Sequence, residues 1–205
     1  MFARTIVALG DSTTAGTPGF QSPVEAPPDG EGDVHSQFAW WMMQAEPGWR
    51  VLNRGVNRER TDAIAARLDR DVLAASPDLL ILLAGVNDVY DGDAPEDVQM
   101  RLAAMYARAR QAGLPVVACS LLPFDTATPD QTTRMHAVNG WIRDTASTTP
   151  GMVFCDTRRA AADPHDGDRL LDSPDGLHPG VEGYRRMGDA LLRVVRDVFA
   201  AAQQV

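Results

Sequence analysis

The sequence LLILLA at residues 79–84 contains only apolar residues. A short run without polar alternation is typical of a strand that helices cover on both faces, which is the position of a central strand in a parallel sheet. Sheets of this kind are built from strands and helices that alternate along the chain. The run at 79–84 therefore predicts further strands and helices in alternation on either side of it.

Four further candidate strands occur, with helical patterns between them. We expect strands at 5–9, 50–53, 115–120 and 152–155, and helices at 34–46, 61–75, 95–112, 130–147 and 181–201. The helix at 95–112 begins with Pro95 and is followed by Gly113, two residues that helix ends favour. The alternation predicts an α/β fold with three αβα layers around a five-stranded parallel sheet. No repeat or linker divides the chain, so we expect a single domain over residues 1–205.

The composition of the chain argues against two classes of binding partner, nucleic acids and membranes. The formal net charge of -9 argues against nucleic acid, because affinity for phosphates comes from clustered cations. No segment approaches the ~20 apolar residues of a membrane span, so stable membrane insertion is not expected. The first strand follows the N-terminus without a signal-peptide pattern, which predicts a cytoplasmic location. The oligomeric state is left open.

Cys119 and Cys155 each follow an apolar run. We expect both to be buried free thiols at strand ends, because two lone cysteines do not form a disulfide framework.

Four polar segments fall near the predicted strand ends: 10–13 after the first strand, 53–57 after the second, 85–88 after the third, and 175–179 before the last helix. Taken alone, each has an ordinary interpretation as a turn. In open parallel sheets, however, the active site lies beyond the carboxyl ends of the strands. Together the segments supply a hydroxyl, two candidate oxyanion donors, and a histidine with a carboxylate three residues before it.

In this order the segments resemble those of the SGNH (GDSL-type) hydrolases. The family is named for four residues in four blocks, and this chain has Ser12, Gly55, Asn87 and His178 at those places. The resemblance runs from residue 7 to residue 183. Thr13 departs from the Leu or Ile of many members, a change next to the nucleophile that leaves the chemistry intact. The resemblance implies a flavodoxin-like SGNH hydrolase fold and a serine esterase that needs no cofactor.

The resemblance also implies roles for single residues. Ser12 would be the nucleophile, and Asp175 and His178 would complete the catalytic triad. The backbone N–H groups of Ser12 and Gly55 and the side-chain amide of Asn87 would form the oxyanion hole.

Two further carboxylates, Asp11 and Asp88, flank these positions and are expected to support the loops by hydrogen bonds. No metal is implied, and the expected partner is a small ester molecule.

Several alternatives remain at this stage. Three other histidines are candidates for the base or for a metal site: His35, His136 and His165. Asp156 and Asp172 are alternatives to Asp175 as the acid of the triad. For all five residues, a structural or surface role is favoured. Trp40, Trp41 and Trp49 could form a platform for stacking on carbohydrate, but core packing is favoured for them. The cluster of Arg54, Arg58 and Arg60 is either a site for an anionic substrate group or a solvated loop. Segments 17–33, 121–129 and 157–174 are expected to shape substrate choice.

Three functions are compatible with this fold. An esterase is favoured over a catalytically silent binding module, since a binding module does not need a full triad. A nucleotide binder would need a phosphate-binding loop that the sequence lacks. The resemblance implies carboxylic esters in general and leaves the acyl group and the substrate class open. The classes are acetylated sugars, short-chain esters, lysophospholipids and thioesters.

Overall fold

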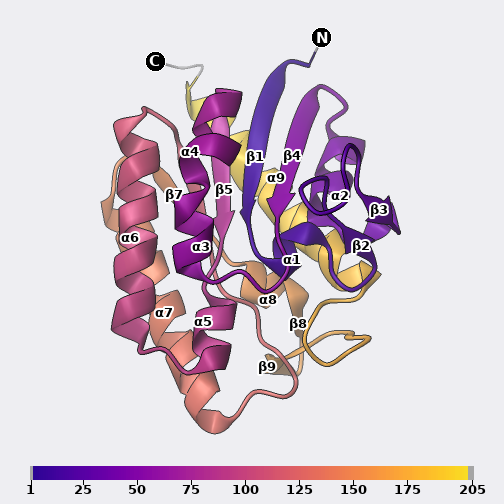
Figure 1. Ribbon diagram of the computed structural model, residues 1–205, viewed down its shortest axis with the longest axis vertical. Coiled ribbons are helices and arrows are strands. Elements are labelled where there is room, and N and C mark those ends of the chain that lie inside the picture. The colour runs from indigo at the N-terminus through magenta and orange to yellow at the C-terminus, as the bar shows by residue number, and fades with distance from the viewer. Residues whose placement is uncertain (1, 203–205) are drawn as a thin grey trace.

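The computed structural model describes residues 2–202. Its centre is a parallel sheet with the strand order β4-β1-β5-β6-β7 (Figure 1). The strands are β1 (Arg4–Gly10), β4 (Trp49–Gly55), β5 (Leu79–Leu83), β6 (Val116–Cys119) and β7 (Met152–Cys155). These are the five strands predicted from the sequence, and the run at 79–84 forms the middle one.

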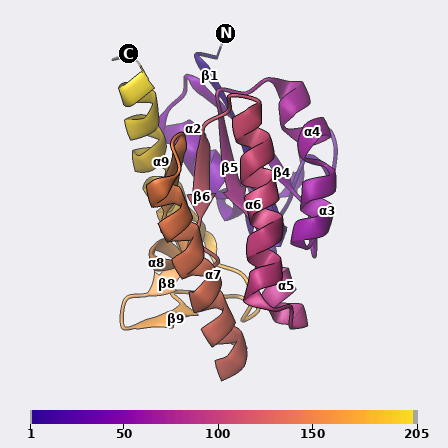
Figure 2. The same ribbon diagram turned by 90° about the vertical axis from the view of Figure 1, so that its left-hand side faces the viewer.

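Side chains of the sheet point alternately into two hydrophobic cores. Val7 and Leu9 of β1 belong to one core, whereas Ile6 and Ala8 belong to the other. The first core is covered by α3 (Thr61–Ala66), α4 (Leu68–Asp71), α6 (Pro95–Gln111) and α7 (Pro129–Thr148), and the second by α2 (Phe38–Ala45), α8 (Thr157–Ala161) and α9 (Val181–Ala202). Figure 2 shows the helices on both sides of the sheet. The three-layer architecture predicted from the alternation is confirmed.

Two predicted helices are interrupted. The helix expected at 61–75 is divided into α3, α4 and the 3-10 helix η2 (Leu73–Ala75). The first break falls at Arg67, whose buried guanidinium donates to the carbonyl oxygens of Gly10 (2.7 Å) and Arg54 (2.8 Å) at the ends of β1 and β4. The helix expected at 34–46 begins as the 3-10 helix η1 (Val34–Ser36) and continues as α2.

Other short elements lie in segments that were expected to be loops. β2 (Phe20–Gln21) pairs with β3 (Glu31–Gly32), and β8 (Ala162–Asp163) pairs with β9 (Asp166–Leu170). Helix α1 (Ser12–Ala15) follows β1, and α5 (Val86–Asp91) follows β5. Most of these elements span too few residues to produce a periodic sequence pattern. β9 is as long as β5, but four of its five residues are exposed, so it lacks the apolar run that marks a core strand.

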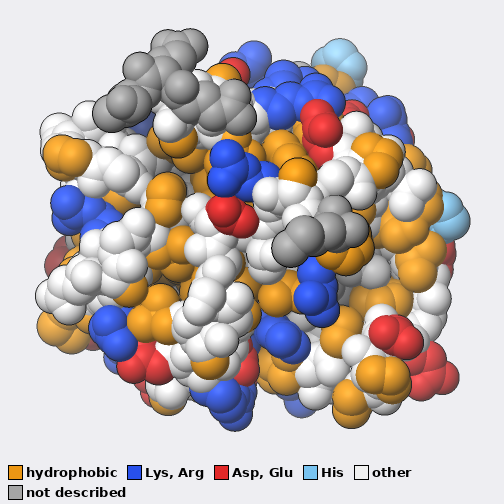
Figure 3. All heavy atoms as spheres, turned by 90° about the horizontal axis from the view of Figure 1, so that it is seen from above, with side chains coloured by type: hydrophobic (Ala, Val, Ile, Leu, Met, Phe, Trp, Pro, Cys, Tyr) orange, Lys and Arg blue, Asp and Glu red, His pale blue; other side chains and the backbone are white. Residues whose placement is uncertain are grey.

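Cys119 and Cys155 are buried and free, as expected, and they lie opposite each other in the register of β6 and β7. Burial raises the pKa of the Cys155 thiol to about 12. Within residues 2–202, no helix combines the length and apolarity needed to cross a membrane. The face at the amino ends of the strands carries charged side chains interspersed with apolar ones (Figure 3).

Candidate active site

Ser12 lies at the carboxyl edge of the sheet, two residues after β1. Glycine is needed at position 10, because a Cβ there would stand 2.1 Å from the carbonyl oxygen of Leu83. The side chain of Asp11 caps α1 by accepting a hydrogen bond from the N–H of Thr13 (3.0 Å). This turn largely buries Ser12 but leaves it in the wall of a cavity.

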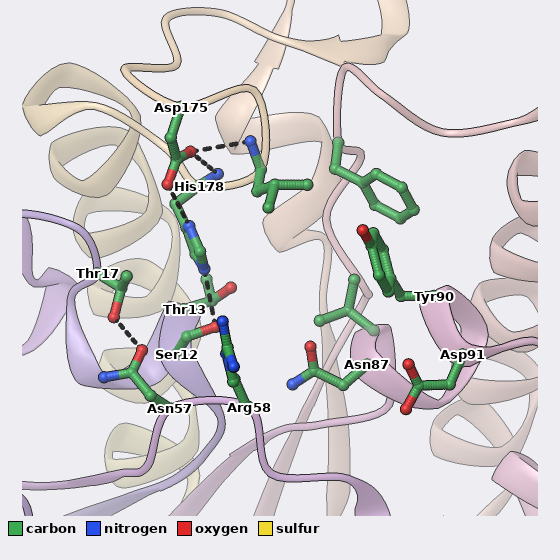
Figure 4. Close-up of a pocket in the computed structure, with 13 residues that line it drawn as sticks. Ser12, Thr13, Thr17, Asn57, Arg58, Asn87, Tyr90, Asp91, Asp175 and His178 are labelled. Atoms are coloured by element: carbon green, nitrogen blue, oxygen red, sulfur yellow. Dashed lines mark hydrogen bonds and ion pairs between the residues drawn. The ribbon is translucent and has the colours of Figure 1, made fainter.

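Ser12, His178 and Asp175 are joined by hydrogen bonds (Figure 4), although Ser12 and His178 are 166 residues apart in sequence. His178 Nε2 lies 2.9 Å from Ser12 Oγ, and His178 Nδ1 lies 2.8 Å from Asp175 Oδ2. When Nδ1 donates to the carboxylate, Nε2 is free to accept the hydroxyl proton of Ser12. This is the arrangement of a nucleophile, a base and an orienting acid.

Asp175 is held by its own loop. Its Oδ1 atom accepts hydrogen bonds from the backbone N–H groups of Leu177 (2.9 Å) and His178 (2.8 Å). Partial burial opposes ionisation, but the hydrogen bonds from the His178 ring and these N–H groups outweigh it and lower the pKa of the Asp175 carboxyl. Asp175 is therefore ionised at neutral pH and is suited to stabilise an imidazolium on His178.

Asn87 projects from the first turn of α5 into the cavity. Its Nδ2 atom donates to the carbonyl oxygen of Glu59 (2.9 Å), which leaves the second amide hydrogen for another acceptor. The neighbouring Asp88 is fully buried and accepts hydrogen bonds from the N–H and hydroxyl of Thr61 (2.9 and 2.5 Å) and from Arg101 (2.9 Å). Asp88 thereby fixes the start of α5 and the position of Asn87.

Gly55, whose N–H is an expected oxyanion donor, does not lie in the cavity wall. Its backbone N–H donates to the side-chain oxygen of Asn53 (3.0 Å), and Gly55 is not among the residues that line the cavity. A Cβ on Gly55 would stand 2.0 Å from the backbone nitrogen of Ala15. This close approach indicates a packing role for Gly55 between β4 and α1, and its role as an oxyanion donor stays a prediction of the sequence.

The loop after β4 presents Asn57 and Arg58 to the cavity instead. Asn57 is held by Glu25, which accepts hydrogen bonds from its backbone N–H (3.0 Å) and its side-chain amide (2.9 Å), and by the hydroxyl of Thr17 (2.5 Å). Arg58 has a φ of +62°, in the left-handed region. Within residues 2–202, the N–H of Arg58 has no hydrogen-bond acceptor.

The cavity has a volume of about 620 Å³ and two kinds of wall. Val86, Tyr90, Phe124 and Leu177 form its apolar part, and the ring centroids of Tyr90 and Phe124 are 5.6 Å apart. The polar part includes the triad, Asn57, Arg58, Asn87 and Asp91. Sequence reasoning missed Tyr90 and Asp91, which lie three and four residues after Asn87. A helix prediction at 86–91 would have placed all three on one face.

The segments expected to shape substrate choice contribute unequally. Thr17 from segment 17–33 and Phe124 from segment 121–129 line the cavity, whereas segment 157–174 supplies none of the lining residues. Segment 17–33 also contributes Glu25, which accepts hydrogen bonds from Asn57 in the loop that carries Arg58.

The alternative bases and acids lie outside the cavity wall: His35, His136, His165, Asp156 and Asp172. His35 contacts Asp33 (2.7 Å), His136 contacts Asp168 (2.9 Å), and Asp156 caps α8. In the described part of the chain, no group of three or more His, Cys, Asp or Glu side chains is arranged to hold a metal ion.

The three tryptophans do not share one environment. Trp49 packs in the core against Phe199, with ring centroids 5.6 Å apart. Trp40 and Trp41 are only half-buried and form a surface cluster with His35. The expected core role therefore applies fully to Trp49 alone.

The model of the GDSL-like lipase/acylhydrolase family matches residues 8–186, which include Ser12, Asn87 and His178. The chain belongs to this family. Membership confirms the resemblance to the GDSL-type hydrolases that the sequence indicated.

One relative of this GDSL-like protein is an acetylxylan esterase from Geobacillus stearothermophilus, 32% identical over 74 residues. The match covers 32% of this chain and 34% of the relative, so the chain spans about a third of the curated relative. A solved G-D-S-L family protein from Desulfitobacterium hafniense has a TM-score of 0.77 at 24% identity. The match covers 93% of this chain and 99% of the Desulfitobacterium chain. A lipase/acylhydrolase from Enterococcus faecalis has a TM-score of 0.74 at 21% identity. That match covers 95% of this chain and 96% of the Enterococcus chain. These likenesses show that the fold is shared.

Proposed function

We propose that this GDSL-like protein hydrolyses carboxylic esters through an acyl-enzyme on Ser12. The observation that carries the proposal is the chain of hydrogen bonds from Asp175 through His178 to Ser12 at the wall of the cavity. His178 takes the hydroxyl proton as Ser12 Oγ attacks the acyl carbon, and then gives this proton to the departing alcohol. Water deprotonated by the same ring then attacks the acyl-enzyme and releases the acid and free Ser12.

The developing oxyanion needs donors on the same side of the cavity. We assign the backbone N–H of Ser12 and the free amide hydrogen of Asn87 to this role. The third donor is the N–H of Arg58 in place of that of Gly55, since Asn53 already accepts the Gly55 N–H. Loss of one such donor slows catalysis by roughly 10²–10³-fold.

The first experiment measures hydrolysis of p-nitrophenyl esters of increasing acyl length by the wild type and by Ser12→Ala. We expect kcat of Ser12→Ala to fall by at least about 10³-fold, because the nucleophile is lost. The matched control is Ser147→Ala, an exposed serine at the end of α7. A fluorophosphonate probe should label the wild type at Ser12, as read by peptide mass spectrometry. Undiminished activity of folded Ser12→Ala would overturn the proposal.

The same acyl series addresses the open substrate classes. Because one relative is named an acetylxylan esterase, acetyl esters, including acetylated sugars, are the first group to test. A preference for longer acyl chains would favour lysophospholipids or thioesters. A folded protein that binds esters but hydrolyses none would support the silent binding module. The cytoplasmic location and the absence of a nucleic-acid partner stay predictions of the sequence.

A further inference from the structure

We infer that the guanidinium of Arg58 recognises an anionic group, a carboxylate or a phosphate, on the ester substrate. The inference rests on the proposed esterase function and narrows its substrate class. It concerns the side chain of Arg58 and is separate from the role proposed above for the backbone N–H of this residue.

The first argument is position. Arg58 lines the same cavity as Ser12 and His178, and Figure 4 shows its side chain on the side of the cavity occupied by Ser12 and Asn87. Both sequence neighbours of Arg58 are held by side-chain interactions. Asn57 is bound to Glu25, and Glu59 forms an ion pair with Arg67 (2.6 Å). The loop therefore holds the Arg58 backbone in place beside the nucleophile.

The second argument is charge. Arg60, two residues later, is paired with Asp91 (3.4 Å) and with Asp93. Among the charged residues of the cavity wall, Asp91 is thus engaged by Arg60, and Asp175 by His178. Within residues 2–202, the Arg58 side chain takes part in no hydrogen bond or ion pair. The cavity therefore presents a cation whose donors are available to a ligand.

The third argument is the backbone. A φ of +62° is unfavourable for any residue with a Cβ, and glycine would fit this position better. The conformation of the loop therefore does not account for arginine at position 58. Of the cluster formed by Arg54, Arg58 and Arg60, only Arg58 lines the cavity. Of the two roles that the sequence leaves open for Arg58, anion binding or a solvated loop, these observations support anion binding.

Guanidinium chemistry defines the ligand. Its planar fork of N–H donors matches two oxygens of a carboxylate or phosphate, and the charge strengthens both hydrogen bonds. The apolar wall formed by Val86, Tyr90 and Phe124 provides a surface for an uncharged apolar part of the same molecule. The expected substrate is an ester with a negative group within a few bonds of the scissile carbonyl, on either its acyl or its alcohol side.

The test uses two matched pairs of esters that differ in one charge. On the alcohol side, 3-carboxyphenyl acetate is compared with 3-carbamoylphenyl acetate. On the acyl side, the mono-4-nitrophenyl ester of adipic acid is compared with the same ester of its monoamide. For each pair, the ratio of kcat/KM for the anionic over the neutral ester is measured for the wild type, for Arg58→Gln and for Arg58→Gly. The intrinsic reactivity of the esters cancels when these ratios are compared between proteins.

We expect the kcat/KM ratio of anionic over neutral ester to fall by about tenfold or more for at least one pair in both Arg58 variants. The reason is that each variant loses a hydrogen bond from a charged group to the substrate. Glycine suits the left-handed backbone, so Arg58→Gly provides a variant without added strain. Arg50→Gln, an exposed residue of β4 away from the cavity, changes the net charge equally and should leave both ratios unchanged.

Ratios that stay within about threefold of the wild type in both pairs would overturn the inference, whatever happens to the absolute rates. An equal loss on the anionic and neutral esters would also overturn it, because the guanidinium would then act on a group common to both. Failure of the proposed esterase function is a different result, in which the wild type hydrolyses none of the four esters.

Discussion

Asp11, next to Ser12 in sequence, has a carboxyl group with almost no exposure to solvent (1%). Its Oδ1 atom accepts the N–H of Thr13, whereas Oδ2 has no partner within the described residues. Burial raises the pKa of Asp11 to about 7; the Thr13 N–H opposes this rise, and the nearby charge of Asp88 adds to it. Asp11 is thus largely protonated in the folded protein under mildly acidic conditions.

This residue should make stability depend on pH. Between the ordinary value of 3.8 and about 7, the folded state holds a proton on Asp11 that the unfolded state has lost. The contribution to the free energy of unfolding is therefore complete below pH 4 and is lost as the pH rises through 7. A tenfold change in proton affinity is worth ~1.4 kcal/mol, so the total loss is of the order of 4 kcal/mol.

Chemical denaturation of the wild type and Asp11→Asn between pH 4 and pH 8 checks this prediction. The amide oxygen of asparagine can still accept the Thr13 N–H, but the side chain cannot titrate. The wild type should lose more stability over this range than the variant does. Parallel curves for the two proteins would show that Asp11 titrates near its ordinary value.

At the level of elements, the contact between β4 and α1 depends on the absence of a side chain at position 55. A Cβ there would stand 2.0 Å from a backbone nitrogen of α1, and backbone atoms cannot rotate away as a side chain can. Position 140 in the middle of α7 is the opposite case, since nothing lies within 4 Å of the Cβ site.

We therefore expect Gly55→Ala and Gly140→Ala to change stability in opposite directions. Gly55→Ala should destabilise the protein by roughly 1–3 kcal/mol or more, because β4 and α1 must separate. Gly140→Ala should stabilise it by roughly 0.5–1 kcal/mol, because alanine loses less backbone entropy in a helix. Urea denaturation measures both. A Gly55→Ala variant as stable as the wild type would contradict the packing role assigned to Gly55.

At the scale of the whole molecule, burial is distributed unequally between the sheet and its periphery. Every residue of β5 is buried, whereas most of β9 is exposed on the small β8–β9 sheet. Cooperative units with few buried contacts open at a lower free energy than the core.

Native-state hydrogen exchange should therefore separate the two regions. We expect the amides of β5 to exchange only through global unfolding, while those of β9 exchange faster by local opening. Mass spectrometry of peptides from 79–83 and 166–170, with and without low denaturant, distinguishes the two routes. Equal protection of β5 and β9 would mean that the small sheet unfolds together with the core.

The sequence by itself determined the architecture and predicted where the candidate site lies. The apolar run at 79–84 and its alternation with helical patterns predicted a three-layer α/β fold, because burial on both faces and helical periodicity are local properties of the chain. The positions of Ser12, Asn87 and His178 after strands or before a helix predicted that they meet, since parallel strands end at one edge of the sheet.

Only the tertiary structure decided which groups face the cavity. Gly55 and Arg58 lie three residues apart, and nothing in their spacing reveals that Asn53 accepts the N–H of Gly55 while Arg58 turns toward the cavity. The short helix that brings Tyr90 to the wall also left no periodic pattern. The physical reason is that the neighbours of a group in space decide whether its donor or its charge is already paired. In this chain those partners, such as Glu25 for Asn57 and Arg60 for Asp91, come from segments about thirty residues away in sequence.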